Sequence, residues 1–362
     1  MSVISFKCPN CDGELLFDPK SGKYKCEYCY SLFSQEELDA MKQDTSEKQD
    51  TSGNQDTSGN QDTSGETHTS EEQGAVVYTC PSCGAQIVTD ETTAATFCYY
   101  CHNPVVLGGR LEGRFLPDKI IPFSIDKKEA EKRFLDYVGS KKFIPRAFFQ
   151  KKQIEALMGV YFPYWLYDTS LQGELQAEAT RVRIWIAGDE EFTETKIYSV
   201  ERDGQVELNN LSQNALQKAN KTLAEGVLPY HFGDMKDFTM GYLSGFLAEK
   251  RDIEKDVLEP GIQQEIKGYA ENLIRESIDG YDGVVVKNCD IQVDHDKWTY
   301  VLLPVWTVTY KGRNGKMYYY SMNGQTGNVC GELPIDFKKL GLLSGIVAAA
   351  VLVIGMIGGY LL

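Results

Sequence analysis

The stretch CPNCDGELLFDPKSGKYKCEYC, from Cys8 to Cys29, contains two cysteine pairs in the pattern C-x2-C-x14-C-x2-C. Seventy-two residues further on, CPSCGAQIVTDETTAATFCYYC, from Cys80 to Cys101, has the same pattern with the same spacing. Aligned without a gap, the two stretches also share Pro9/Pro81, Asp18/Asp90 and Tyr28/Tyr100. The repeat predicts two small modules of one kind.

The spacing of the cysteines predicts a metal site in each module. A two-residue gap lets both thiolates of a pair bind one cation, and two pairs complete a tetrahedral shell of four sulfurs, which suits zinc. We therefore predict two zinc ions. Iron in a similar four-sulfur site, or a redox dithiol, is the alternative. The predicted ligands are Cys8, Cys11, Cys26 and Cys29 in the first module, and Cys80, Cys83, Cys98 and Cys101 in the second.

Both predicted zinc ions are structural. Four protein thiolates fill the coordination shell, whereas a catalytic zinc keeps one position open. Each ion contributes folding free energy to a module too small for a core of its own. In the first module a strand-like GELLF, a turn at DPKSG and a second strand-like KYK separate the pairs, which predicts a zinc ribbon. His102 follows Cys101 and could replace a thiolate, but we interpret it as an exposed side chain.

Charge helps to choose the kind of partner. The chain of 362 residues has a formal net charge of −15, which disfavours nucleic acid and anionic membrane surfaces because both are polyanions. Residues 75–109 contain Asp90 and Glu91 but no lysine or arginine, so the second ribbon cannot neutralise phosphates. The N-terminus shows no signal-peptide pattern, so clustered cysteines indicate metal ligands in a reducing compartment.

The C-terminal segment predicts a membrane anchor. Leu340 to Leu362 is 23 residues without a charge, and a helix of that length spans the ~30 Å hydrocarbon core. Lys338 and Lys339 precede it, which predicts a single pass through the cell membrane with the N-terminal bulk in the cytoplasm. The alternative is a buried core helix. The small-residue pairs Gly341/Gly345 and Gly355/Gly359 suggest a homo-oligomer through this helix.

The predicted fold class is α+β. Residues 43–66 are six-residue repeats without an apolar residue, which predict a disordered acidic linker between the ribbons. Two Pro-x-Trp motifs, around Trp165 and Trp306, suggest two related halves of the α+β domain. The predicted order is ribbon 1 at 1–34, linker at 35–74, ribbon 2 at 75–110, an α+β domain at 111–335 with halves 111–205 and 206–335, and a transmembrane helix at 338–362.

Local patterns within the α+β domain predict three helices, at 124–139, 211–226 and 260–280, with β-branched and aromatic strands between them. Asn314-Gly315 predicts a hairpin turn. Pro163 and Pro304 are expected at strand ends, because proline cannot donate to a ladder. Trp165 and Trp306 could line an aromatic ligand groove, but we favour core anchors.

The sequence contains no recognisable catalytic motif, and we expect no enzyme activity. His295 lies between Asp294 and Asp296, which could form a metal or acid–base site; we favour a polar turn between two strands. Cys289 and Cys330 lie outside the two frames and are expected to be small apolar side chains.

The two cysteine frames, the strand LPVWTVTY, the segment MNGQTGNVCGELP and the C-terminal apolar helix together resemble bacterial proteins of the transcription-factor-IIB-type zinc-ribbon-containing family. The resemblance covers most of the chain; the six-residue repeat is an insertion outside it. It implies two N-terminal zinc ribbons, an α+β domain and a C-terminal transmembrane helix, and it implies no particular activity.

From these features we expect a tail-anchored, zinc-binding adaptor or scaffold whose ribbons bind a protein partner that the sequence does not identify. The first alternative is a nucleic-acid-associated regulator that uses the ribbons. The second is an enzyme or small-molecule binder that uses the α+β domain.

Overall fold

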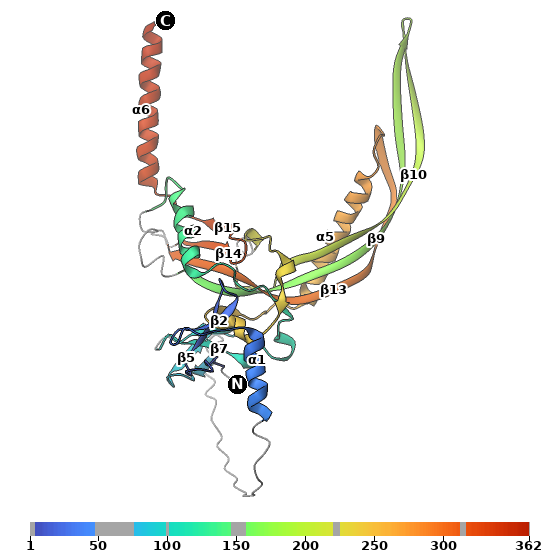
Figure 1. The fold of residues 1–362 in the computed structure, drawn as a ribbon. Coiled ribbons are helices and arrows are strands. Elements are labelled where there is room, and N and C mark those ends of the chain that lie inside the picture. The colour runs from blue at the N-terminus through green and yellow to red at the C-terminus, as the bar shows by residue number, and fades with distance from the viewer. Residues whose placement is uncertain are drawn as a thin grey trace. The chain divides into compact units, whose positions relative to one another are not determined.

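The structure is a computed structural model that describes residues 4–47, 76–98, 101–145, 157–219, 225–311 and 316–361 (Figure 1). Its helices are α1 (Gln35–Glu47), α2 (Lys127–Gly139), α5 (Lys255–Glu276) and α6 (Phe337–Leu361), besides short 3-10 turns such as η5 (Met240–Leu243). Its strands are β1 (Leu15–Asp18), β2 (Lys23–Cys26), β3 (Leu32–Phe33), β4 (Val76–Thr79), β5 (Gln86–Thr89), β6 (Thr93–Phe97), β7 (Pro104–Val106), β8 (Lys119–Ile120), β9 (Met158–Ala187), β10 (Glu190–Asn214), β11 (Lys236–Asp237), β12 (Leu247–Glu249), β13 (Gly283–Lys311), β14 (Met317–Asn323) and β15 (Val329–Glu332). The predicted α+β class is confirmed.

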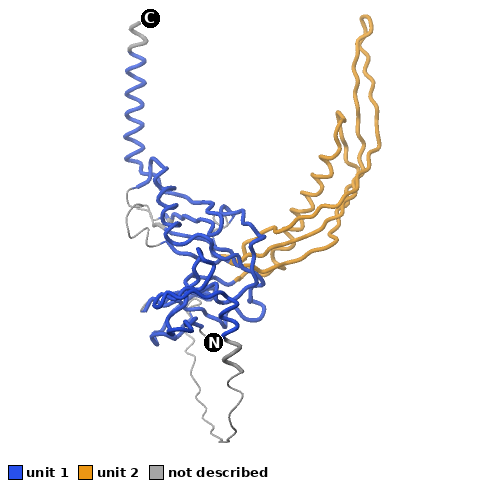
Figure 2. Tube along the Cα trace, viewed as in Figure 1, with its two compact units in different colours: residues 1–162, 218–250, 302–362 blue, residues 163–217, 251–301 orange. Residues whose placement is uncertain are grey.

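The chain forms two compact units (Figure 2). Unit 1 consists of Met1–Phe162, Lys218–Lys250 and Leu302–Leu362, and unit 2 of Pro163–Gln217 and Arg251–Val301. The long strands β9 and β13 contribute residues to both units. The predicted domain boundaries stay predictions. Helix α1 occupies the first part of the predicted linker, and residues 48–75, which hold most of the six-residue repeats, lie outside the described residues.

Aromatic side chains form the core of unit 1. Phe123 stacks on Phe246 with ring centroids 4.2 Å apart, and Trp306 meets Phe123 edge-on at 5.1 Å. Trp306 is buried, and its indole N–H donates to the carbonyl of Ile125 at 3.0 Å. A buried indole with a satisfied N–H is a core anchor rather than the wall of a groove.

Unit 2 is built from long antiparallel strands covered by one helix. β9 and β10 pair continuously from Ala187↔Glu190 to Leu208↔Thr169. From Tyr167 to Thr180 the side chains of β9 alternate between buried and more exposed, and helix α5 packs on the buried side, where Leu171 lies in one cluster with Ile262 and Ile266 (Figure 1). The long, half-buried strands follow from this alternation, since the period of a strand is two residues.

Trp165 is the corresponding aromatic anchor of unit 2. It is buried, and its N–H donates to the carbonyl of Ile253 at 3.0 Å. The guanidinium of Arg251 lies 4.8 Å from the Trp165 ring centroid and 5.3 Å from that of Tyr300, a stack that lowers the cost of burying the charge. Both tryptophans of the Pro-x-Trp motifs therefore serve as core anchors.

The predicted positions of the two prolines are wrong. Pro163 and Pro304 lie inside β9 and β13 rather than at strand ends. Each stands where its strand changes partner. β9 pairs with β12 up to Tyr161 and with β10 from Tyr164. In β13 the carbonyl of Leu302 accepts from the Ile121 N–H, and pairing with β14 begins at Val305. A residue without an N–H costs least at such a break in the ladder.

Helix predictions are partly right. α2 begins after Asp126, whose carboxylate accepts from the Glu129 N–H at 2.9 Å, as the capping pattern predicts. The predicted helix at 211–226 is wrong at its start, because Leu211–Asn214 belong to β10; residues 220–224 lie outside the described residues. α5 begins at Lys255, so that Pro260 lies inside it.

The structure agrees with one prediction for β13, its hairpin with β14, and not with the other, the turn at His295. β13 and β14 pair antiparallel from Lys311↔Met317 to Val305↔Asn323, as expected for the predicted hairpin, but the predicted turn at Asn314-Gly315 lies outside the described residues. The predicted polar turn at His295 is wrong, because Asp294, His295 and Asp296 all lie within β13. The backbone carbonyl of His295 accepts from the Thr169 hydroxyl at 3.0 Å.

Gly173 allows α5 to approach the sheet closely, and this gives a test of the unit 2 packing. A Cβ at this position would meet the side chains of Ile274 and Ile291, whereas a Cβ at Gly204, its cross-strand partner, has nothing within 4 Å. We expect Gly173→Val to destabilise unit 2 by about 1–3 kcal/mol through overpacking. Thermal unfolding should show a lowered midpoint for Gly173→Val only; an equal loss in the control Gly204→Val would contradict the packing.

Candidate metal centres

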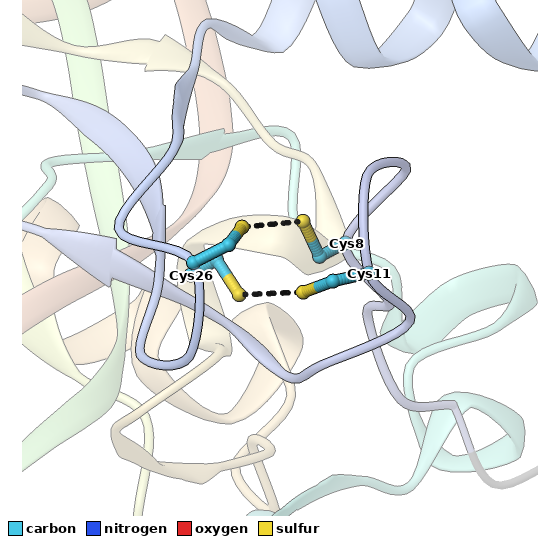
Figure 3. A group of neighbouring side chains, drawn as sticks. Cys8, Cys11 and Cys26 are labelled. Atoms are coloured by element: carbon cyan, nitrogen blue, oxygen red, sulfur yellow. Dashed lines mark hydrogen bonds between the residues drawn. The ribbon is translucent and has the colours of Figure 1, made fainter.

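The cysteine side chains of the first group point toward one another (Figure 3). All four Sγ atoms lie within 4.8 Å of one another, with Cys8–Cys29 and Cys11–Cys26 at 3.5 Å. Cys8 and Cys26 are buried, while Cys11 and Cys29 are exposed, so one side of the site faces solvent.

The second group repeats this geometry. Its Sγ atoms also lie within 4.8 Å of one another, with Cys80–Cys101 and Cys83–Cys98 at 3.7 Å. Two sulfurs of a tetrahedral zinc site with ~2.3 Å bonds lie about 3.8 Å apart, whereas a disulfide requires ~2.05 Å. None of the ten cysteines, all of which lie in the described part of the chain, forms a disulfide. The structure therefore brings the eight predicted cysteines into two groups that fit two metal ions, and the four-sulfur donor set suits zinc.

One backbone turn occurs four times in these centres. In each pair the N–H of the first cysteine donates to a carbonyl five residues later, as Cys8 does to Gly13 at 2.7 Å and Cys80 to Ala85 at 2.8 Å. The residue after each second cysteine donates its N–H back to the first cysteine's carbonyl and has a positive φ. These residues are Asp12 (61°), Tyr30 (59°), Gly84 (76°) and His102 (59°).

This turn explains the place of His102, which the sequence analysis considered as a possible replacement for a thiolate ligand. We call the short loop that carries each cysteine pair a knuckle. The backbone of His102 takes the left-handed conformation that closes its knuckle, as Gly84 does after Cys83. The four knuckle-closing residues were not singled out from the sequence. Their common position, one residue after the second cysteine of each pair, could have identified them.

The two ribbons differ between their knuckles. In ribbon 1, β1 and β2 form the expected hairpin from Leu15↔Cys26 to Asp18↔Lys23. Strands pair around the second knuckle in both ribbons, β2 with β3 in ribbon 1 and β6 with β7 in ribbon 2. In ribbon 2, however, β5 pairs with β4 around the first knuckle and lies in a different sheet from β6. β6 also pairs with β12, through Ala95↔Ala248. The β6–β7 half of ribbon 2 is thus part of the large sheet, although the cysteine spacing of ribbon 2 equals that of ribbon 1.

The ribbons contact each other directly. Glu14 of ribbon 1 is buried, and its Oε1 accepts from Lys7 Nζ at 2.7 Å. The same oxygen accepts from ribbon 2, from the Ser82 hydroxyl at 3.1 Å and the Asn103 amide at 3.3 Å. Ile4 and Val106 add a backbone bridge, with both N–H groups donating across it. The metal centres therefore form one block within unit 1.

Polar contacts hold this block on the rest of unit 1. Lys20 of ribbon 1 pairs with Asp126 at 2.8 Å, and Asp90 of ribbon 2 pairs with Lys218 at 2.7 Å. Lys218 also pairs with Glu249 at 2.8 Å. Burial acts to raise the pKa of Asp90, but the hydrogen bonds from Lys218 and Thr93 and the charge of Lys218 together outweigh it and hold that pKa well below its usual range.

The thiols influence one another electrostatically. The hydroxyl and backbone N–H of Ser31 lower the pKa of Cys29 to about 6. The backbone of Gly13 acts in the same direction on Cys11, but hydrogen bonding with Cys29 and Cys26 raises the pKa of Cys11 to about 12. Without a cation the group retains protons at neutral pH, so binding a cation must release them.

The other residues considered from the sequence lie apart from these centres. Cys289 is partly buried against the core of unit 2, and Cys330, in β15, is partly buried in unit 1. His295 is exposed on β13. Within the described residues, the metal-ligand groupings are the two four-cysteine groups.

Comparison with known proteins gives one informative relative. The chain is 32% identical over 362 residues to the Uncharacterized protein YdjG of Bacillus subtilis (strain 168), and the alignment covers 99% of each chain. No family model matches the chain. No solved structure matches it either. Identity at this level over the whole length shows that the chain belongs to the same family as YdjG.

The two centres predict a metal content that can be counted. Full-length protein purified in detergent without chelator should contain two zinc ions per chain by elemental analysis. Cys80→Ser with Cys83→Ser should lower the content to one, because a centre that loses two of its four thiolates no longer closes its shell. Cys289→Ser is the control and should leave two. A content near zero, or iron in place of zinc, would contradict the assignment.

Proposed function

We propose that this member of the YdjG family is a membrane-anchored adaptor whose zinc ribbons bind a partner protein in the cytoplasm. The proposal assigns structural roles to both zinc ions and no catalytic activity to the chain. It is supported by the closed donor sets, by the surface of ribbon 1 and by the C-terminal helix.

The surface around the second knuckle of ribbon 1 carries the proposal. Tyr28 is 74% exposed, Tyr30 71% and Leu32 47%, and we call these three residues the knuckle surface. Tyrosine in such a position supplies large contact area at a low entropic cost and is enriched at protein interfaces. A groove beside it is lined by Leu16, Phe17, Asp18, Lys25, Glu27 and Tyr30.

The metal sites support a binding role because they fix this surface. Cys26 and Cys29 bracket Tyr28, and Tyr30 closes the same knuckle through its N–H to Cys26 at 3.1 Å. A cation held by four thiolates makes this short loop rigid, and a preformed surface binds with a smaller ordering cost. With four protein ligands, no position stays open for a reacting water.

The ion pairs of ribbon 1 argue against the nucleic-acid alternative. Two of the four lysines of ribbon 1 are engaged by carboxylates, Lys7 by Glu14 and Lys20 by Asp126. Lys25 lies over the ring of Tyr30, with Nζ 5.7 Å from the centroid. Since affinity for phosphate backbones grows with the number of phosphates neutralised, this ribbon is poorly equipped for it.

Helix α6 supports the membrane part of the proposal. Its segment Phe337–Met356 has a mean hydropathy of 2.1, and none of it is buried. A core helix of comparable hydropathy would be covered by other elements, so the exposure speaks against the core-helix alternative. Length and composition allow the helix to cross a membrane.

Anchoring has a direct test. If α6 spans the bilayer, full-length protein should stay in the membrane pellet after extraction with alkaline carbonate, because an inserted helix is not released by breaking ionic contacts. Replacing Val347 and Val351 with lysine should shift the protein to the supernatant. Release of the unmodified chain would show that α6 does not anchor it.

Partner binding is tested at the knuckle surface. Full-length protein is cross-linked to its neighbours and purified, and the cross-linked proteins are compared between variants. Tyr28→Ser with Tyr30→Ser should lower the yield of at least one of them about tenfold or more, because exposed aromatic anchors dominate interface energies. The matched control is Val77→Ser with Val88→Ser, an exposed apolar pair of ribbon 2. Both variants should keep two zinc ions. An unchanged set of cross-linked proteins would contradict the proposal.

A further inference from the structure

The outer part of the β9–β10 hairpin, residues 180–197, extends past the end of β13. β13 begins at Gly283, and the contacts at its start reach Thr180 and Val182: the N–H of Asp282 donates to the Thr180 carbonyl at 2.8 Å, and the Val182 N–H donates to the Asp282 carboxylate at 2.6 Å. Beyond this point the hairpin has two strands only in the described part of the chain. We call residues 180–197 the outer hairpin.

One face of the outer hairpin is apolar and exposed. Cross-strand partners share a face, and the register pairs Val182 with Thr195, Ile184 with Thr193 and Thr180 with Ile197. The exposed fractions are 39% for Val182, 60% for Ile184, 73% for Ile186 and 65% for Ile197. Branched apolar residues and threonines therefore form a strip without lysine or arginine, and Glu191, the cross-strand partner of Ile186, lies at its outer end.

The opposite face combines aromatic and basic side chains. Trp185 and Phe192 are cross-strand partners that stack with ring centroids 5.7 Å apart and planes 14° apart. Arg183 lies over the Trp185 ring at 5.7 Å. Arg181 and its partner Lys196 continue this face toward the sheet, and Glu194, the partner of Arg183, pairs with Lys196 at 3.4 Å.

Such a hairpin needs a partner. A two-stranded ribbon in water is at best marginally stable, and an apolar strip of this length on a soluble surface marks an interaction site. In the described residues of unit 2, helix α5 covers the hairpin's inner part, where Ile274 packs with Ala177 and Ala179, and not the outer strip.

The chemistry of the two faces fits a lipid surface. Apolar side chains enter the boundary of the acyl chains, tryptophan prefers the headgroup level, and arginine and lysine extend their charges outward from it. Asp189 in the turn and Glu190 and Glu191 at the start of β10 are charged and exposed, which excludes entry of the tip into hydrocarbon. The hairpin would therefore lie along the surface with its apolar strip inward.

A second copy of the chain fits less well. A stable interface buries roughly 800 Å² on each partner, more than a strip of four side chains on two strands supplies. The charges of residues 180–197 nearly balance, with three basic and four acidic side chains, so attraction to a polyanion is not the driving force.

We propose that the outer hairpin is a second membrane contact, lying in the lipid interface through Val182, Ile184, Ile186 and Ile197. The inference rests on the proposed membrane anchorage, which supplies the surface, but it concerns a different segment from α6. Because the hairpin and α6 are separate elements, one experiment can test each without the other.

Trp185 is a natural probe of this contact. Trp165 and Trp306 are buried, whereas Trp185 is 41% exposed, so the difference between the parent and Trp185→Phe isolates its emission. Full-length protein is reconstituted in phosphatidylcholine vesicles with bromine on the acyl chains, either near the headgroup or deep in the bilayer. We expect the shallow bromine to remove about half of the Trp185 emission and the deep bromine less, since tryptophan sits at the interface.

Ile184→Lys with Ile186→Lys should abolish this quenching, while the protein stays resistant to carbonate extraction. The matched control places the same charges at two other exposed valines of unit 2, Val257→Lys with Val285→Lys, and should keep the quenching. Trp185 emission unaffected by either bromine, with α6 still inserted, would overturn the hairpin contact and leave the anchor standing. Cross-links between outer hairpins of two copies without quenching would overturn it in favour of a dimer. Quenching that persists when carbonate releases the protein would instead contradict the anchor alone.

Discussion

Two groups of four cysteines, each fit to hold one cation, set the constraint on which the ribbons of unit 1 depend. Each ribbon has strands of two to five residues, too short to hold a fold by burial alone. The left-handed residue after each second cysteine, such as Tyr30, brings the Sγ atoms to within 4.8 Å of one another. Because β6 joins the large sheet through Ala95 and Ala248, the second centre also stabilises an edge of that sheet. A cation bound by these groups would therefore couple metal binding to the folding of unit 1.

A different constraint is the continuity of the long strands β9 and β13, each of which contributes residues to both units. Pro163 and Pro304 interrupt neither strand, because each falls where the ladder passes from one partner to the next. The aromatic anchors follow directly after them: Trp165 is held by Ile253 and stacked by Arg251, and Trp306 is held by Ile125. The Pro-x-Trp motif thus combines a partner change with a core anchor two residues later.

Much of this architecture can be read from local pattern. The eight cysteine ligands, the cap of α2 at Asp126 and the apolar helix α6 each depend on residues near one another in sequence. Predictions failed where a distant segment decided the outcome. Leu211–Asn214 have helical periodicity but pair with β9, and the polar run at His295 continues as strand because its neighbours hold it in the sheet.

The sequence by itself determined the two metal centres, the α+β class and the membrane-length helix, because thiolate spacing and hydrophobic length act within a few turns of chain. Only the tertiary structure decided how these parts are used. It placed Glu14 where one carboxylate accepts from both ribbons, made the β6–β7 half of ribbon 2 part of the large sheet despite a spacing equal to ribbon 1, and left the apolar strip of residues 180–197 uncovered. The physical reason is that strand pairing and burial join residues far apart in sequence, and no local pattern encodes which partner, if any, a strand will find.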